Sequence, residues 1–520
     1  MSRLFLHFCA AEPAVRRFYG NTPDAPWYPR PPLPSHWPAI VDILAAQNPN
    51  PSAAASIQAL RGGAGTVLTG QQVALFGGPL FTPFKAATAL ARARQASAAG
   101  HPHVAIFWLA GEDHDFAEIN HVTFPDRREL RKLVYEPFPE NAVPVGDILL
   151  DGPIAPLLEQ AAELIGYSDA LEALNEAYQP GRTFAQAFAH FYSRVFAAQG
   201  LLILDASGRA VHALGAPVLR AAIEQADEFH AALIDRDAAL RTAGYHVQVA
   251  VTPQSSLLFL IDPRTGARIA LRRTPATPSE PNGLFQAGRD RYSTSDLLGI
   301  LAAEPERISP SALLRPVFQD SLLGTSLTIG GPAEVAYFAQ SQVLFESILG
   351  RMTPLQPRLS ASLVEPDIAE LLRRHELTLD RVLSENQDGL AQLLAARDLP
   401  IDGKRRLAAA GNALDAELSA LLDWMHSLDP GLGRSGDTAA EKMRYQMNRL
   451  RRLAADFQLQ KEASLARHAQ AIHNALFPGG HLQERVHGAA WYFARHGFDL
   501  AQTLVERAGE PCPGHIALWL

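Results

Sequence analysis

The fold is decided by residues 65–121, which read GTVLTGQQVALFGGPLFTPFKAATALARARQASAAGHPHVAIFWLAGEDHDFAEINH. Two apolar runs, 66–68 and 103–110, predict buried strands, and the run 83–99 between them predicts a helix. A strand–helix–strand unit of this size places its strands in parallel with a right-handed crossover. We therefore predict an open, parallel, Rossmann-like sheet, which would bind ligands at the carboxyl ends of its strands.

Both predicted strands run directly into polar residues. The first ends in Thr69, Gly70, Gln71 and Gln72, and the second is followed by Glu112, Asp113, His114, Asp115, Asn120 and His121. Neighbouring carboxylates raise one another's pKa, so a cation, a metal or a substrate ammonium group is expected to offset them. The alternative is a solvated loop whose acids cap the next helix. We favour a functional site that joins both clusters around one cleft.

Several short motifs resemble those of the BshC family, the cysteine ligases of bacillithiol biosynthesis. They are TGQQ at 69–72, GPLFT at 78–82 with Lys85, FWLAGEDHDF at 107–116, LRP at 314–316 with QD at 319–320, GGP at 330–332 with Glu334 and AYFAQ at 336–340, and QER at 483–485. The resemblance covers nearly the whole chain, and the combined motifs are far more specific than a lone glycine pattern. It implies that L-cysteine is joined to glucosaminyl-malate through an amide bond, in the last step of bacillithiol synthesis.

The implied reaction needs an energy source. Joining a carboxylate to an amine is uphill in water, so the cysteine carboxylate would be activated as an acyl-phosphate or an acyl-adenylate. The resemblance also implies a bound adenine nucleotide, ATP or ADP, and a dimeric assembly. No Walker A pattern and no strict G-x-G-x-x-G follows a predicted strand, so neither a P-loop kinase nor a dinucleotide oxidoreductase is supported.

These considerations predict three sets of site residues. The catalytic set is Gln72, Asp113, His114 and Asp115, with Asp113 or His114 as the general base on the incoming amine. The substrate-binding set is Thr69, Gly70, Gln71, Glu112, Asn120 and His121. The set that would bind an anion or the nucleotide is Gly78, Lys85, Arg315, Gly330, Gly331 and Glu334. Mixed histidine and carboxylate groups also suit metals, but no H-E-x-x-H motif occurs; we assign no metal ligand and leave a metal requirement open.

Composition limits the class of protein. The 520 residues suggest two or three folding units, and a net charge of -8 gives no basic surface for nucleic acid. Only two cysteines occur, Cys9 and Cys512, which favours a reducing cytoplasm over a disulfide framework. The short apolar run 4–11 is interrupted by His7 and does not predict a signal peptide, and no run of about 20 apolar residues predicts a membrane span.

The rest of the chain divides into a core and a helical part. We expect a Rossmann-like core at 1–365, with insertions at about 125–199 and 208–300, a helical domain at 366–480, and a segment at 481–520 that returns to the core. A proline-rich strap should open the core, and residues 200–205 should add another parallel strand. Strands are also expected at 247–250, 256–261 and 268–272, the last two joined by a hairpin turn.

Residues 403–475 show the spacing of an antiparallel coiled coil. Apolar residues alternate at intervals of three and four on two helices separated by the glycine-rich run 430–436. The expected seam is Leu407, Gly411, Leu414, Leu418, Leu421, Met425 and Leu428 against Met443, Met447, Leu450, Ala454 and Phe457. Further apolar residues off this seam, such as Trp424 and Leu453, suggest that the arm forms a homodimer; a lid over the active site is the alternative.

Two other functions remain possible on the sequence alone. One is a nucleotidyltransferase-like enzyme that stops at adenylation, and the other is a coiled-coil scaffold protein whose α/β core merely holds a ligand. Clustered acids at the strand ends favour an enzyme, because a scaffold has no need of them. Detection of the amide product would separate the ligase from the adenylating enzyme.

Overall fold

The computed structural model describes residues 2–20, 24, 26–126, 129–136, 138–274, 284–510 and 514–520. Pro23 of the expected strap and Cys512 lie outside these residues. Contacts divide the chain into two compact units, which we call the core unit and the helical unit. The core unit comprises residues 1–124, 132–360 and 487–516, and the helical unit comprises residues 125–131, 361–486 and 517–520. Residues 481–486 and 517–520, expected with the core, therefore cluster with the helical unit.

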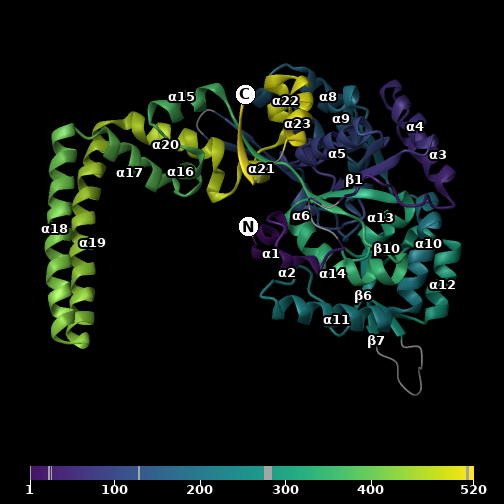
Figure 1. Cartoon of the computed structure of the whole chain (residues 1–520). Helices are drawn as coiled ribbons and strands as arrows, with labels where there is room; N and C mark the ends of the chain where they lie inside the picture. The colour runs from purple at the N-terminus through teal and green to yellow at the C-terminus, as the bar shows by residue number, and fades with distance from the viewer. Residues whose placement is uncertain are drawn as a thin grey trace. The chain divides into compact units, whose positions relative to one another are not determined.

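A parallel sheet forms the centre of the core unit, as the sequence predicts (Figure 1). Its strand order within the described residues is β12 (Leu355–Pro357), β11 (Thr325–Gly330), β1 (Gly65–Gln71), β2 (His103–Leu109) and β5 (Leu202–Asp205). Every neighbouring pair is parallel, with Thr69 opposite Phe107 and Leu109 opposite Asp205. The carboxyl ends of the five strands therefore lie along one edge.

Apolar side chains cover both faces of this sheet. Ile106 and Trp108 point into a core shared with the helices of the 209–349 region, while Phe107 points to the opposite face and stacks on Tyr192 at 5.9 Å. This alternation follows from the two-residue period of a strand. The helix α5 (Phe81–Ala98), almost wholly buried, packs against β1 and β2 and is covered in turn by α23 (Asp499–Gly509).

The remaining helices of the core unit surround the sheet. They are α1 (Arg3–Cys9), α2 (Pro13–Arg16), α3 (Trp37–Gln47), η1 (Pro51–Ala53), α4 (Ala54–Arg61), η2 (Leu75–Gly77), α6 (Phe116–Ile119), η3 (Val145–Asp147), α7 (Ile154–Ile165), α8 (Asp169–Ala177), α9 (Phe184–Val195), η4 (Ala197–Gln199), α10 (Arg209–Glu224), α11 (Ala226–Thr242), α12 (Thr294–Ala303), η5 (Pro305–Arg307), α13 (Arg315–Leu323), α14 (Pro332–Leu349) and α22 (Ala489–His496). Among the described residues of 1–61, four α-helices form, more than a proline-rich strap predicts, and residues 26–34 run without regular structure.

The expected antiparallel insertion is a larger sheet than the hairpin predicts. Its order is β10 (Ile308–Pro310), β6 (Ser255–Ile261), β7 (Arg268–Thr274), β8 (Leu284–Ala287) and β9 (Asp290–Tyr292). The predicted strand at 247–250 is wrong, because that segment is irregular and Gln340 hydrogen-bonds both Val249 N and Val249 O. Two-stranded sheets also join β3 (His121–Pro125) to β4 (Leu130–Val134) and β13 (Ser360–Val364) to β14 (His515–Trp519).

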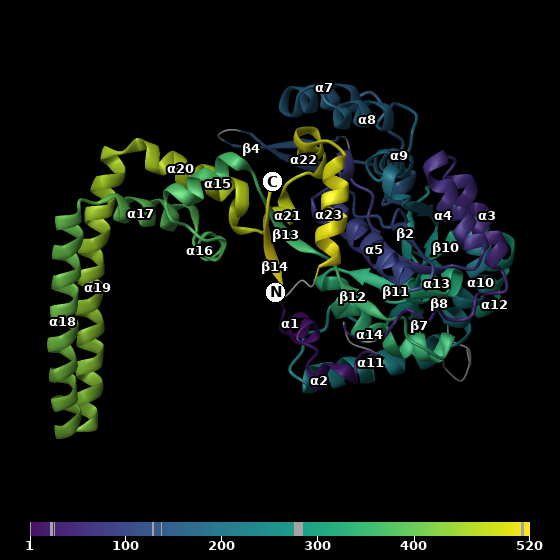
Figure 2. The ribbon, with the colours of Figure 1, turned by 45° about the horizontal axis from the view of Figure 1, so that its top comes forward.

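The helical unit contains a long two-helix arm, α18 (Ile401–Leu428) and α19 (Pro430–Lys461), which lie side by side in Figures 1 and 2. Its other helices are α15 (Pro366–Arg374), α16 (Leu379–Leu383), α17 (Gln387–Asp398), α20 (Ala463–Leu476), η6 (Pro478–Gly480) and α21 (Gln483–Val486). The glycine-rich run 430–436 is not a loop but the first two turns of α19. Asp429 alone turns the chain, and its carboxylate accepts the N–H groups of Gly431 and Leu432.

The seam of the arm differs from the expected one. Gly411 and Leu418 are buried on α18, and small residues such as Gly436 and Ala440 are buried opposite them on α19. Five residues assigned to the seam are instead partly or mainly exposed at its outside: Leu421 (49%), Leu428 (57%), Met443 (49%), Leu450 (56%) and Phe457 (68%). Glycine and alanine let the helices approach closely, so the large apolar residues at neighbouring positions face outward. Nowhere in the described residues is a helix long and apolar enough to cross a bilayer.

Candidate functional site

Gln72 and Asp113 meet at the carboxyl edge of the parallel sheet. They follow β1 and β2, which are neighbours, so the chain leaves both strands side by side. Gln72 Nε2 donates to Asp113 Oδ2 at 2.7 Å, and the backbone N–H of His114 donates to Asp113 Oδ1 at 2.7 Å. Both oxygens of Asp113 are thereby held, while 34% of its side chain remains exposed. A carboxylate that is fixed and open to solvent can accept a proton from a bound substrate.

The buried Lys85 ammonium ties three segments together. Its Nζ lies 2.6 Å from Glu334 Oε2 and donates to Gly70 O at 2.7 Å and Gln71 Oε1 at 2.9 Å. The same Glu334 oxygen accepts the N–H of Gly331 at 2.6 Å, in the first turn of α14. Burial lowers the pKa of Lys85, and Glu334 opposes that shift. The helix N-terminus expected to bind an anion is therefore already capped by the protein's own carboxylate.

Two arginines lie near these acids, of which Arg268 is buried and Arg315 partly buried. Arg315 opens α13; burial opposes its charge, but Tyr337, Asp113 and Glu334 raise its pKa overall. Arg268 opens β7, and burial lowers its pKa although carboxylates nearby favour the charge. We refer to Gln72, Lys85, Glu112, Asp113, His114, Arg268, Arg315 and Glu334 as the edge site.

Glu112 is held by a histidine from another segment. Its Oε1 lies 2.8 Å from His212 Nε2, and Ile308 O lies 3.0 Å from His212 Nδ1. His212 is fully buried. Burial disfavours the imidazolium, yet the Glu112 carboxylate and backbone carbonyl groups raise the pKa of His212 above its ordinary value. The pair therefore fixes the Glu112 carboxylate at the end of β2.

Asp147 adds a further acid beside Glu112. Gly146 N donates to Gly111 O at 2.8 Å, and a Cβ on Gly111 would lie 3.1 Å from the Gly146 Cα, so the two glycines permit this close approach. Although the Asp147 side chain reaches solvent, desolvation by the surrounding protein, together with Asp205 and Glu112, raises its pKa to about 6. The negative charges of Glu112 and Asp205 thus disfavour the ionised form of Asp147 next to the edge site.

Several residues assigned to the site from the sequence have other contacts. Thr69 is buried and donates to Ile329 O at 3.1 Å, which ties β1 to β11. The N–H of Gly78 donates to Leu75 O, so it does not present a free donor to an anion. Asp115 is exposed and directly precedes α6. The pKa of Glu118 is raised mainly by desolvation and next by the negative charge of Asp115.

Asn120 and His121 belong to the neighbouring β3–β4 ladder. Asn120 is buried, and its Nδ2 donates to Tyr135 O at 3.1 Å. His121 Nδ1 lies 3.3 Å from Asn120 Oδ1, and burial and Lys132 lower the pKa of its imidazole. Within the described part of the chain, no hydrogen bond joins either residue to Gln72 or to residues 112–115. Their contacts in the structure therefore tie them to the β3–β4 ladder, and their place in the substrate-binding set stays a prediction.

Sequence reasoning missed Arg268 and His212. The pairing of His212 with Glu112 is a tertiary contact across 100 residues of sequence. The one available signal was its place among apolar residues on a helix, which requires a partner for the buried imidazole. Nothing in the sequence distinguishes Arg268 from Arg272 and Arg273, which follow it on the same strand.

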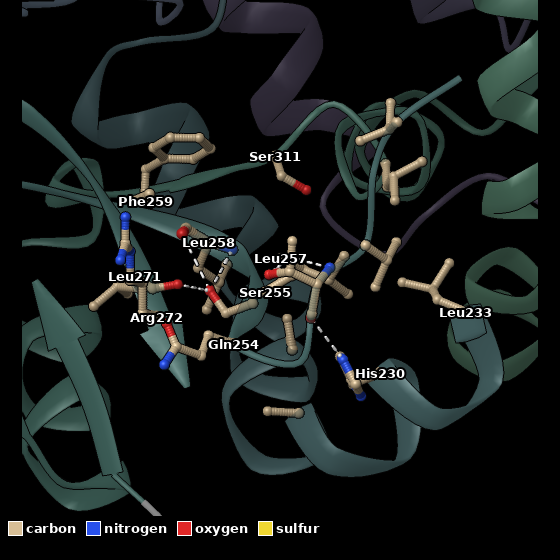
Figure 3. A pocket seen from close by; sticks show the side chains of 18 of the residues that line it. His230, Leu233, Gln254, Ser255, Leu257, Leu258, Phe259, Leu271, Arg272 and Ser311 are labelled. Carbon is tan, nitrogen blue, oxygen red and sulfur yellow. Dashed lines mark hydrogen bonds between the residues drawn. The ribbon is translucent and has the colours of Figure 1, made fainter. Parts of the chain in front are cut away.

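A cavity of about 680 Å³ is lined by residues of β6 and β7 and by the segment 249–254 (Figure 3). Its walls are mainly apolar. Several of the polar groups that line it form hydrogen bonds within the protein; His230 Nε2, for example, lies 2.9 Å from Thr252 O. Phe259 lines the cavity and also contacts Arg268 and His114. The described residues contain no group of three or more His, Cys, Asp or Glu side chains that could hold a metal ion.

The fold and the site define a Rossmann-like α/β protein with polar groups gathered at the carboxyl edge of its sheet and a coiled-coil module attached. The chain belongs to the BshC family: residues 1–359 match the model "Bacillithiol biosynthesis BshC, N-terminal Rossmann-like domain", and residues 361–517 match "Bacillithiol biosynthesis BshC, C-terminal coiled-coil domain". The predicted family and fold class are confirmed.

Curated relatives match most of the chain. Proteins named "Putative cysteine ligase BshC" are 41% identical in Koribacter versatilis (90% of this chain, 86% of the relative), 33% in Solibacter usitatus (93% and 89%) and 31% in Salinibacter ruber (96% and 93%). These names do not favour the adenylating enzyme or the scaffold protein. A crystal structure titled as a "putative arginyl t-RNA synthetase" from Campylobacter jejuni covers 90% of this chain and 98% of its own, but with a TM-score of 0.24 and 11% identity the similarity is too low to interpret.

Proposed function

We propose that the protein is a ligase that joins the carboxyl group of L-cysteine to the amine of glucosaminyl-malate, the last step of bacillithiol biosynthesis. The family supports the reaction, and the observation that carries it is the fixed, partly exposed Asp113 carboxylate whose charge acts on the guanidinium groups of Arg268 and Arg315. A carboxylate can take the proton that the attacking amine must lose, and guanidinium groups bind carboxylates such as those of malate.

An adenine nucleotide is the proposed source of energy for this reaction. The donor set at the edge site fits an anionic group in charge, since Lys85 is a buried cation and Arg315 a partly buried one. Glu334 is bound to Lys85 and to Gly331 N, so a phosphate group would have to displace that carboxylate. When bound, the nucleotide would convert the cysteine carboxylate into a better acylating group. We therefore assign Lys85 and Arg315 to the phosphate and leave the adenine base unplaced.

Mass spectrometry of product formation tests the function. Purified protein is incubated with glucosaminyl-malate, L-cysteine and ATP, and the mixture is examined for the amide and for ADP or AMP. We expect the amide with stoichiometric release of one of these nucleotides. Release of AMP and pyrophosphate without amide would identify an adenylating enzyme instead, and absence of any turnover would contradict the ligase.

We also propose that the arm makes the protein a homodimer. Exposed apolar residues form rows on both helices, with Leu421, Trp424 and Leu428 on α18 and Met443, Leu450, Leu453 and Phe457 on α19. Contiguous exposed apolar surface usually marks an interface, and a two-fold dimer is the commonest arrangement.

The use of a free thiol substrate and the small number of cysteines support a reducing, cytoplasmic location.

A further inference from the structure

Arg268 is held in one position by contacts on three sides. Its Nε donates to Ser309 Oγ at 3.0 Å, and its Nη2 donates to Pro310 O at 3.0 Å. The guanidinium carbon lies 3.7 Å from the centre of the Phe259 ring, a stacked cation–π arrangement (the ring is labelled in Figure 3). Arg268 is 8% exposed and Ser309 is fully buried. The remaining nitrogen, Nη1, is therefore directed rather than mobile.

That nitrogen reaches the imidazole of His114. Arg268 Nη1 lies 3.4 Å from His114 Nδ1, whereas the nearest Asp113 oxygen is 3.7 Å from the same atom. A guanidinium group can donate hydrogen bonds but cannot accept them. His114 Nδ1 must therefore offer its lone pair, and the neutral ring carries its proton on Nε2. The ring also contacts Phe259, with the two centres 5.9 Å apart, which limits its rotation.

We propose that Arg268 is a positioning residue that holds His114 as the Nε2–H tautomer, so that His114 donates a hydrogen bond to the substrate and Asp113 alone serves as the general base. This inference rests on the proposed ligase function and deepens it. The charged groups around His114 are Arg268 and Asp113, with Glu112 and Arg315 acting on Arg268 from further away. With 37% of the His114 side chain exposed, a ligand can reach the ring.

The roles fit the covalent step of amide formation. The lone pair of the sugar amine attacks the carbonyl carbon of the activated cysteine, and a carbon–nitrogen bond forms. The carbonyl oxygen gains negative charge, which a donor such as His114 Nε2–H stabilises. The ammonium proton passes to Asp113, and the carbon–oxygen bond to the phosphate-type leaving group breaks with its electron pair.

Nitrogen NMR of histidine-labelled protein tests the tautomer without any substrate. The His114→Gln variant identifies the signal by its disappearance. We expect the wild-type ring to show an unprotonated Nδ1 and a protonated Nε2, and Arg268→Met to shift the ring toward a mixture of tautomers. Arg272→Met changes an exposed arginine of the same strand and should leave the signal unchanged. A wild-type proton on Nδ1, or a signal unaffected by Arg268→Met in a folded protein, would overturn the proposal.

Turnover of two His114 variants gives a second readout. Glutamine places an N–H near the position of Nε2 but cannot act as a base, whereas alanine supplies neither. We expect His114→Gln to retain most of the rate and His114→Ala to lose about 10²-fold, the usual cost of one such donor. Equal losses in both variants would contradict the donor role. Because the NMR result needs no turnover, failure of the ligase assay and failure of this inference are distinguishable. Circular dichroism checks that Arg268→Met and the Arg272→Met control are folded.

Discussion

Asp113 is the residue on which the chemistry depends. Replacing it with asparagine keeps the hydrogen bonds to Gln72 and to the His114 backbone within reach but removes the group that accepts a proton. We expect Asp113→Asn to lower kcat by about 10²-fold or more, since general base catalysis contributes on that order. Steady-state kinetics at saturating substrate measures this. Asp235→Asn, an exposed change on α11, is the matched control, and a normal kcat for Asp113→Asn would remove Asp113 from the mechanism.

Lys85 and Glu334 should depend on each other for stability. Lys85→Met leaves the Glu334 carboxylate without its cation. Removing one partner of a fully buried pair costs about 3–5 kcal/mol, and we expect a smaller loss here because 21% of the Glu334 side chain is exposed. The double change Lys85→Met with Glu334→Gln removes the unpaired charge, so we expect it to recover part of that loss. Urea unfolding of the four proteins of this cycle, with the exposed Lys132→Met as control, measures the coupling. Additive effects would mean that the pair does not act as a unit.

His212 should make stability depend on pH. Its pKa is raised in the folded protein from an ordinary value of 6.5, so the folded state binds the proton more tightly than the unfolded state does. The resulting stabilisation is fully present below pH 6.5 and is lost as the pH rises through the raised value. We therefore expect wild type and His212→Gln to differ most in free energy of unfolding at low pH. The difference should shrink as the pH rises, while the exposed His246→Gln should give a difference that does not vary.

At the scale of elements, the turn η2 has a strained backbone that hydrogen bonds from two tyrosines hold in place. Phe76 has a positive φ of 49° there, a conformation that side chains rarely adopt. The Tyr178 hydroxyl accepts Gly77 N at 2.9 Å and donates to Ala74 O at 2.7 Å, and the Tyr192 hydroxyl donates to Gly77 O at 2.6 Å. This network holds the chain between β1 and α5.

Tyr178→Phe should therefore destabilise the core unit. It leaves the Gly77 N–H and the Ala74 carbonyl buried without that partner, at about 1–3 kcal/mol for each unsatisfied group. Thermal or urea unfolding would show the loss. Tyr167→Phe removes a hydroxyl from a residue that is 98% exposed, so we expect no measurable change there. Equal stability of the two variants would show that the network is dispensable.

Strands and their polar ends could be predicted from sequence because they are local patterns. Apolar runs such as 103–110 determine a buried strand, and parallel pairing places Gln72 beside Asp113 with no further information. The contacts of Arg268 and His212 could not be predicted in this way, since each depends on how a distant segment is placed. The same limit explains the seam of the arm, where the small size of Gly411 and Gly436, rather than the count of large apolar residues, sets which faces meet.

At the scale of the whole molecule, the arm predicts the oligomeric state. Leu450→Asp together with Phe457→Asp places charge on the exposed row of α19 without touching its buried seam. Light scattering should give twice the 56.4 kDa chain mass for wild type and a single chain mass for this variant. Thr438→Asp with Asn448→Asp, two exposed changes of α19 outside the row, should remain dimeric. A wild-type mass of one chain at micromolar concentration would exclude the dimer.

The division of residues 487–520 between the two units has a consequence for how the protein is made. Residues 487–516 complete the core unit, where α23 covers α5, and residues 517–520 join the helical unit, where Leu520 N donates to Val364 O at 3.1 Å. Domains usually fold one after another as the ribosome delivers them, the first before the second is finished. Here neither unit can close until its last segment has been translated. A nascent chain therefore carries the apolar surface of α5 uncovered until residues 499–509 have been translated, and we expect it to be prone to aggregation during that interval.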